Sequence, residues 1–369
     1  MQTVGQGWAL ICLAGWLCAA LLGVLFTRLA IGMAPRLGLV DKPHHEAHKN
    51  HGRVTAVGGG SAMFLAWATT LLLGVLGLLW LTTRGSGDLP DTGELLVGLG
   101  NMRRQMCLLL GGTLVLTAVG LIDDIRPMKA GRKFLWQIIV AAVTACWGPR
   151  LTFGCHISFL TWAVTTLWIV TIINAVNFFD NMDALAGGTA AIACFFFLIV
   201  ACLRGQFLVS GLAAVTGGCI CGFLWYNRPP ARIFMGDSGS HLLGYLLAVI
   251  SILTTFYLPS DSPTASPLLI PLLVLGIPLF DAVAVVLIRL RLHKPVYVGD
   301  NRHLSHRFVS LGLSRAQAVF VIWLLSFITG AGALNLLWLP RAGVILVFGQ
   351  FTALMVTVTL IQFFVHRTD

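Results

Sequence analysis

The chain has 369 residues and a formal net charge of +10, and 57% of its residues are hydrophobic while only 10% are charged. Soluble domains carry about 25% charged residues, so this composition excludes a soluble globular protein and indicates a polytopic membrane protein. The surplus of basic residues suits anionic lipid and, beyond that, an anionic substrate.

Apolar stretches near the roughly 20 residues that a helix needs to cross a bilayer recur along the whole sequence. The polar segments between them are too short for a separate soluble domain. We therefore predict an all-α bundle forming a single integral-membrane domain over residues 1–369. About eleven spanning helices are expected, at 8–30, 57–82, 105–122, 134–150, 157–176, 185–203, 207–226, 240–258, 267–289, 317–338 and 342–365.

Basic residues are concentrated in the loops that follow the odd-numbered spans, for example Lys42, Arg132, Arg228 and Arg307. Because basic loops stay on the cytoplasmic side of a membrane, the N-terminus is predicted outside and the C-terminus in the cytoplasm. No basic residue precedes Arg28, so we expect the first stretch to remain as a helix rather than to be a signal peptide.

Carboxylates and amides gather in three clusters that this orientation places at the cytoplasmic face: GLIDDIRPMKAGRKFLWQ, NAVNFFDNMDALAGG and FMGDSGSHLLGY. In the first, Asp123 and Asp124 are adjacent and repel one another unless a cation or a shared proton relieves them. We read them as a Mg²⁺ or proton-transfer site, with Lys133 placed to meet a phosphate. A solvated helix end, paired with Arg126 or Lys129, is the alternative.

In the second cluster Asn174, Asn177, Asp180 and Asp183 recur every three residues, which places their oxygen atoms on one side of the segment. Mg²⁺ prefers carboxylate and amide oxygens and keeps several water or phosphate ligands. The pattern therefore favours a Mg²⁺ site. Helix capping is the alternative, and Asp183 is the residue it would explain, at the start of the next helix.

In the third cluster Asp237 lies between two glycines just before a predicted helix, where backbone N–H groups can approach a phosphate. Phe234 precedes it by three residues and is expected either to stack on a base or to fill the core. A fourth group lies in the last predicted cytoplasmic loop, where His303, His306 and Arg307 follow one another closely. Histidines beside an arginine suit anion binding, and a solvated basic loop at lipid head groups is the alternative.

With these motifs in this order, the chain resembles the polyprenyl-phosphate N-acetylhexosamine-1-phosphate transferases over nearly its whole length. The resemblance implies transfer of a sugar 1-phosphate from a UDP-sugar to a lipid phosphate such as undecaprenyl phosphate, with release of UMP. It also implies Mg²⁺, with Mn²⁺ as the alternative, and a multi-pass protein of the bacterial plasma membrane that serves cell-envelope glycan synthesis.

The last loop reads H-x-S-H-R followed by LGLSRAQA, which is similar to the N-acetylglucosamine branch of the family rather than to the N-acetylmuramoyl-pentapeptide branch. Three residues depart from the family pattern. Ser305 stands where that branch has a histidine, and Asn181 and Ala184 stand where the usual D-G-x-D-G motif has glycines. These departures bear on the sugar and on the nucleotide contacts.

The resemblance also implies a role for individual residues of this chain. They are Asn177 and Asp237 on Mg²⁺; Lys133, His303, His306 and Arg307 on phosphates; Asp180, Asn181, Asp183 and Phe234 at the nucleotide; and Asp123 and Asp124 at the lipid phosphate, one of them as a base.

The expected partners are a UDP-sugar and a polyprenyl phosphate, with no nucleic acid. A homodimer is left open, and so is the choice between direct attack and a covalent aspartyl intermediate. The alternative functions are transfer of the N-acetylmuramoyl-pentapeptide phosphate and, from a different class, membrane transport. Transport is less favoured because the polar clusters lie at one face rather than near the bilayer midplane.

Overall fold

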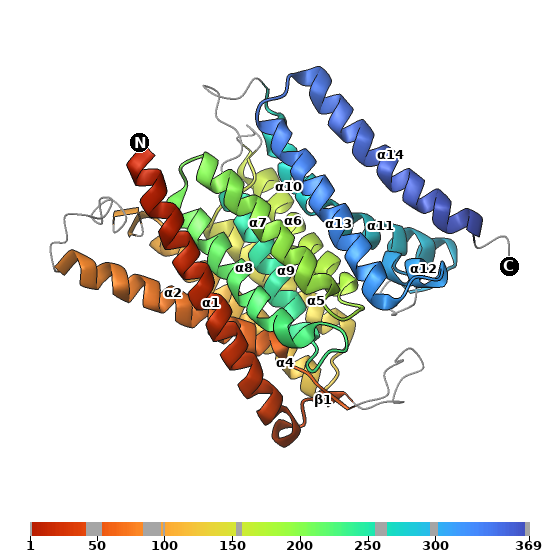
Figure 1. Cartoon of the computed structure of the whole chain (residues 1–369), viewed down its shortest axis with the longest axis horizontal. Helices are drawn as coiled ribbons and strands as arrows, with labels where there is room; N and C mark the ends of the chain where they lie inside the picture. Colours follow the sequence, from red (N-terminus) through yellow and green to blue (C-terminus); the bar gives the residue numbers. More distant parts are fainter. Residues whose placement is uncertain are drawn as a thin grey trace.

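A computed structural model describes residues 2–41, 54–83, 97–98, 100–152, 157–254, 264–295 and 302–365 of the chain. These residues form a bundle of long helices (Figure 1), so the prediction of an all-α membrane bundle is confirmed. The helices are α1 (Gln2–Leu37), α2 (Gly59–Thr83), α4 (Arg103–Ile125), α5 (Ala130–Trp147), α6 (Ser158–Phe179), α7 (Leu185–Leu203), α8 (Phe207–Asn227), α9 (Gly236–Leu253), α10 (Ile270–Val274), α11 (Gly276–Arg291), α12 (Leu304–Ser310), α13 (Arg315–Leu334) and α14 (Arg341–Val365), with 3₁₀ turns at Ser266–Leu269 and Asn335–Leu337.

Every predicted span coincides with helical structure, but fewer than eleven helices qualify as spans by length and apolarity. In the described residues nine helices do so, and Ser266–Val274 and Gly276–Arg291, which meet at a 68° bend, form either a tenth, broken span or a re-entrant loop. The remaining predicted span, 134–150, corresponds to α5. The 18 residues of this helix include Arg132 and Lys133, so α5 is not apolar enough to count among the nine candidate spans. The orientation of the termini and the single domain remain predictions.

The centre of the bundle is α9, whose N-terminal end is packed tightly against α4 and α2. Glycines allow this approach. A Cβ atom on Gly120 of α4 would lie 2.4 Å from the backbone nitrogen of Ser238, and one on Gly60 of α2 would lie 2.0 Å from that of Gly239. Neither position has room for a side chain, so the ends of these three helices meet at one place.

A short strand pair holds the segment before α9. Strand β1 (Val40–Asp41) pairs antiparallel with β2 (Thr55–Ala56), an element that the all-α prediction did not include. The Phe234 backbone nitrogen donates to the carbonyl of Ala56 at 2.8 Å, and Gly59 in turn donates to the carbonyl of Phe234 at 3.0 Å. These backbone contacts set the position at which α9 begins. Pairs of two residues each are too short to leave a periodic signal in a sequence.

The outer helices cover this centre unevenly. Helix α14 runs along the outside of the bundle (Figure 1), and only 11% of its most apolar window is buried, against 78% for α9. A face of this kind suits contact with lipid. The break between α10 and α11 lies at Leu275, beside Gly276 and Pro278, two residues that commonly occur at helix bends.

Candidate active site

Lys133 joins two of the predicted clusters directly. Its ammonium nitrogen lies 3.0 Å from Oδ2 of Asp123, at the end of α4, and 2.7 Å from Oδ2 of Asp237, at the start of α9. Residues 104 positions apart thus form one ion-paired group. The Lys133 side chain keeps 25% of its surface exposed and Asp237 keeps 24%, so a ligand has access to both.

Asn177 brings the second cluster to the same group from the last turn of α6. Its side-chain nitrogen donates to Oδ1 of Asp237 at 3.0 Å and to the hydroxyl of Ser240 at 2.8 Å. The two predicted metal ligands, Asn177 and Asp237, are therefore in contact. The amide nitrogen makes these bonds, so the amide oxygen is the atom of this side chain that could ligate a cation.

Asp124 has a structural contact that the sequence did not reveal. Its carboxylate accepts the backbone N–H groups of Asp237 at 2.8 Å and Ser238 at 3.2 Å. These are N–H groups of the first turn of α9, which have no partner within their own helix, and a carboxylate there is stabilised by the helix dipole. Gly236 makes this possible: its φ is +72°, and a Cβ atom there would lie 2.4 Å from the Asp124 carboxylate. Asp124 therefore anchors α9, while Asp123 pairs with Lys133.

Asp180 lies in the segment between α6 and α7, and its surroundings disfavour a further negative charge. Burial raises the pKa of Asp180 to about 8, and the charges of Asp237, Asp124 and Asp183 add to the effect. Carboxylates crowded in this way indicate a place where a cation is electrostatically favoured.

The capping alternative for Asp183 is wrong. Helix α7 begins at Leu185 with no side-chain cap, and the carboxylate of Asp183 instead accepts the backbone N–H of Ala231 at 3.0 Å. Ala184, the N-cap residue, has a left-handed φ of +63°. Glycine adopts this conformation without strain, whereas alanine pays about 1–2 kcal/mol for it. The turn is kept in spite of the departure from the glycine pattern, with the Ala184 N–H held by Asn227 at 2.8 Å.

These residues fit Mg²⁺ by their chemistry. Asp237 and Asp180 offer carboxylate oxygens, and Asn177 offers an amide oxygen, which are the ligand types of a hard cation. In the part of the chain that the structure describes, no three His, Cys, Asp or Glu side chains are arranged as a complete metal site. A cation held here would take its other ligands from amide, water or phosphate oxygens, as Mg²⁺ commonly does.

The predicted anion-binding loop meets the site through Asn181. The hydroxyl of Ser305, in α12, donates a short hydrogen bond to the Asn181 side-chain oxygen. His303 precedes α12, and its ring centre is 6.5 Å from that of His306. Nε of Arg307 donates to the carbonyl of Arg302 at 2.9 Å. The His303–Arg307 segment therefore contacts the segment between α6 and α7 through Asn181.

The Phe234 backbone is held by β2 and its side chain is half-buried, so stacking on a base stays a prediction.

Asp281 of α11 contacts His303 and was not among the residues predicted from the sequence. A single carboxylate inside an apolar span was the available signal, because such residues are commonly functional.

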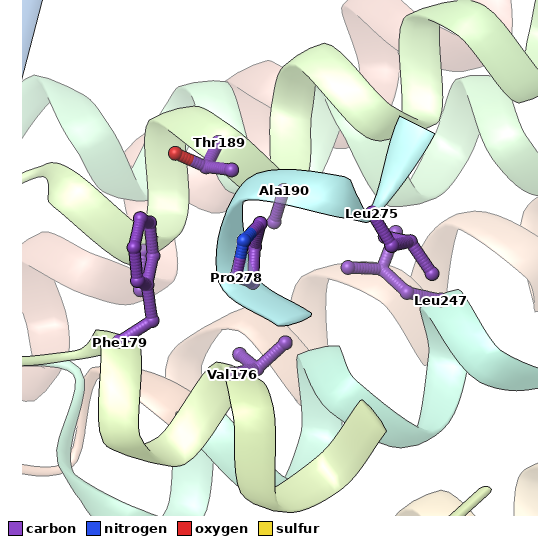
Figure 2. Close-up of a pocket in the computed structure, with 8 residues that line it drawn as sticks. Val176, Phe179, Thr189, Ala190, Leu247, Leu275 and Pro278 are labelled. Carbon is purple, nitrogen blue, oxygen red and sulfur yellow. The ribbon is translucent and has the colours of Figure 1, made fainter. Parts of the chain in front are cut away.

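A small apolar cavity is lined by Val176 and Phe179, which are the sequence neighbours of Asn177 and Asp180. Figure 2 shows Val176 and Phe179 of α6, Thr189 of α7 and Pro278 of α11 around it. The cavity forms where the bend before α11 meets α6, α7 and α9.

The fold and this site define an integral-membrane protein with a carboxylate, lysine and amide centre at the meeting ends of α4, α5, α6 and α9. The chain belongs to glycosyl transferase family 4, and the family's sequence profile matches residues 106–255. It is 31% identical, over 85% of its length and 81% of the relative's, to a probable undecaprenyl-phosphate N-acetylglucosaminyl 1-phosphate transferase of Bacillus subtilis.

Two further relatives have different functional names. A decaprenyl-phosphate N-acetylglucosaminephosphotransferase of Mycobacterium leprae is 30% identical over 92% of this chain and 88% of its own length. A phospho-N-acetylmuramoyl-pentapeptide-transferase of Geobacillus kaustophilus is 29% identical over 63% of this chain and 72% of its own length. The resemblance seen in the sequence motifs is thereby confirmed.

Proposed function

We propose that the protein transfers N-acetylglucosamine 1-phosphate from UDP-N-acetylglucosamine to undecaprenyl phosphate and releases UMP. The observation that carries this proposal is the convergence of Asp123, Lys133, Asn177 and Asp237 from four helix ends on one partly exposed group. The relatives named for N-acetylglucosamine transfer align with 85% and 92% of the chain, whereas the named N-acetylmuramoyl relative aligns with 63%. This difference supports the smaller sugar.

The site is proposed to face the cytoplasm of a bacterial cell, at the inner boundary of the plasma membrane. A polyprenyl tail stays in the bilayer while its phosphate reaches the surface, and the nucleotide sugar arrives from water. A polar group at the ends of membrane helices can contact both the lipid phosphate and the nucleotide sugar. The distribution of basic residues supports this orientation.

In the proposed reaction an oxygen of the lipid phosphate forms a bond to the sugar-bearing phosphorus, and the bond from that phosphorus to the UMP oxygen breaks. Positioning and charge neutralisation supply most of the catalysis in phosphoryl transfer. Lys133, already between two carboxylates, would exchange part of that contact for phosphate oxygens. A phosphate monoester has a second pKa near 6 and is mostly dianionic at neutral pH, so direct attack needs little help from a base.

Within this scheme Asp123 orients the lipid phosphate or accepts its remaining proton. Asn177 and Asp237 would hold Mg²⁺, or Mn²⁺ in its place, which when bound supplies positive charge to offset the charge of the diphosphate. The other predicted ligand residues keep their assignments: Asp180, Asn181, Asp183 and Phe234 at the nucleotide, and His303, His306 and Arg307 at the diphosphate or the sugar.

The test is turnover by the purified full chain with undecaprenyl phosphate, Mg²⁺ and separate UDP-sugars, following UMP. We expect UMP release with UDP-N-acetylglucosamine, and its loss on chelation or in Asp237→Ala. Release only with the UDP-N-acetylmuramoyl-pentapeptide would replace the sugar in the proposal. If folded protein released no UMP from any donor, the proposal would be wrong.

A further inference from the structure

Asp281 is the one carboxylate of helix α11, and only 1% of its surface is exposed. A buried carboxylate is strongly unfavourable unless hydrogen bonds or an opposite charge compensate it. This residue has no place in the site as described so far. Its contacts show what it does.

Both oxygens of Asp281 are directed at the start of α12. Oδ2 lies 2.7 Å from Nδ1 of His303, and Oδ1 accepts the backbone N–H of Leu304 at 2.6 Å. Leu304 is the first residue of α12, so the carboxylate supplies the cap that the helix lacks from its own side chains. One buried group thus holds both the imidazole ring and the backbone beside it.

The contact also decides which ring nitrogen of His303 is available. An ionised carboxylate only accepts hydrogen bonds, so Nδ1 must carry a hydrogen and Nε2 is left for another partner.

One hydrogen bond of α12 shows which segment His303 lies near. Ser305, two residues after His303, is bonded to Asn181, in the segment that carries Asp180. His303 itself is 5% exposed, so little of the ring can move. Asp281 thus fixes an imidazole near the segment between α6 and α7.

We infer that Asp281 is a positioning residue that holds His303 with Nδ1–H bound to the carboxylate and Nε2 available to the nucleotide donor. The inference rests on the proposed function, since the donor is the proposed one. Asp281 touches no substrate and acts through His303.

The variant that separates this role from a merely structural one is Asp281→Asn. Asparagine keeps an oxygen for the Leu304 N–H, but it presents an N–H₂ group to His303, which forces Nδ1 to accept and moves the ring hydrogen to Nε2. We expect kcat/KM to fall about 10- to 100-fold, the range for loss of a carboxylate that orients a metal-ligating histidine. The loss should fall mainly on KM for the donor.

A double-variant comparison tests the route through His303. If Asp281 acts through the ring, Asp281→Asn should add less than about twofold to the loss already caused by His303→Ala. Ser326→Ala is the matched control, because Ser326 is a buried hydroxyl of α13 whose bond stays within its own helix. It should leave kcat/KM unchanged.

The rise in unfolding temperature caused by UDP-N-acetylglucosamine, without the lipid, provides a readout independent of turnover. We expect this rise in the wild type and in Ser326→Ala, and a smaller rise in Asp281→Asn and His303→Ala alike. Wild-type kinetics retained in Asp281→Asn, or losses that multiply in the double variant, would overturn the role of Asp281 and leave the transferase standing. Wild-type protein that neither turns over nor is stabilised by the donor would overturn both.

Discussion

The hydroxyl of Ser305 donates to the side-chain oxygen of Asn181 and joins α12 to the segment between α6 and α7, 124 positions earlier. Both residues depart from the family pattern, which has histidine and glycine at these places. Glycine offers no side chain to accept the bond, and an imidazole is larger than the hydroxymethyl group of serine. The two departures therefore form a matched pair.

Each single substitution in this pair should lower the free energy of unfolding by more than half of the loss that the double substitution causes. Ser305→Ala or Asn181→Ala leaves the other polar group without its partner, at about 1–3 kcal/mol each. The loss in the double variant should be about 1 kcal/mol smaller than the sum of the two single losses, as for residues in contact. The free energies of unfolding of all four proteins in one detergent would measure this coupling, and strictly additive losses would contradict the pairing.

Lys133 should be essential because it neutralises two carboxylates. Lys133→Met leaves Asp123 and Asp237 facing one another without the ammonium group that lies within 3.0 Å of both. We expect kcat/KM to drop by at least about 100-fold, which corresponds to about 2.7 kcal/mol of transition-state stabilisation. Lys129→Met, which removes an exposed lysine just before α5, is the control and should retain activity. Equal activities in the two variants would exclude the role.

Gly236→Ala should disrupt the start of α9, because the new Cβ atom would lie 2.4 Å from the Asp124 carboxylate. Gly38→Ala is the matched control. Gly38 has a φ of +71°, close to the +72° of Gly236, but no atom lies within 4 Å of its Cβ position. Both variants bear the strain of about 1–2 kcal/mol. Only Gly236→Ala should abolish UMP release in folded protein, and similar kinetics in both would show that the contact is unimportant.

Binding of Mg²⁺ should release a proton from Asp180. The pKa of this carboxyl is raised from 3.8 to about 8 by burial and by neighbouring carboxylates, so at pH 7 it is mostly protonated in the metal-free protein. A cation favours the ionised form, so the affinity should rise with pH by up to about tenfold per unit below pH 8 and level off above it. Stability of the metal-free protein should fall over the same range, from about pH 4 to 8, because the unfolded chain loses this proton first.

Calorimetric titration of Mg²⁺ at pH 7 in two buffers of different ionisation enthalpy measures the proton directly. The heats should differ between the buffers for the wild type and agree for Asp180→Asn. Equal heats for the wild type would mean that Asp180 is already ionised or lies too far from the cation.

Part of the candidate site was predictable because its residues are close in sequence or unusual in an apolar chain. Two features were visible in this way. One is the three-residue spacing of Asn177, Asp180 and Asp183, and the other is the position of Asp237 just before a helix. The anchoring of α9 by Asp124 was not, since a carboxylate that caps a distant helix looks the same in sequence as one that faces a ligand. Asp281 did leave a signal, as a lone carboxylate in an apolar span, but its partner His303 is 22 residues away and the contact is visible only in the fold.

By itself the sequence determined that this protein is a membrane bundle of helices, because a hydrocarbon environment leaves backbone groups no other partners than their own helix. It also determined which helix ends carry the polar residues. Only the tertiary structure decided that Lys133 lies between Asp123 and Asp237 and that Asp281 holds His303. Such contacts depend on how glycines such as Gly120 and Gly60 let the helices approach. That is a property of packing, which no local pattern encodes.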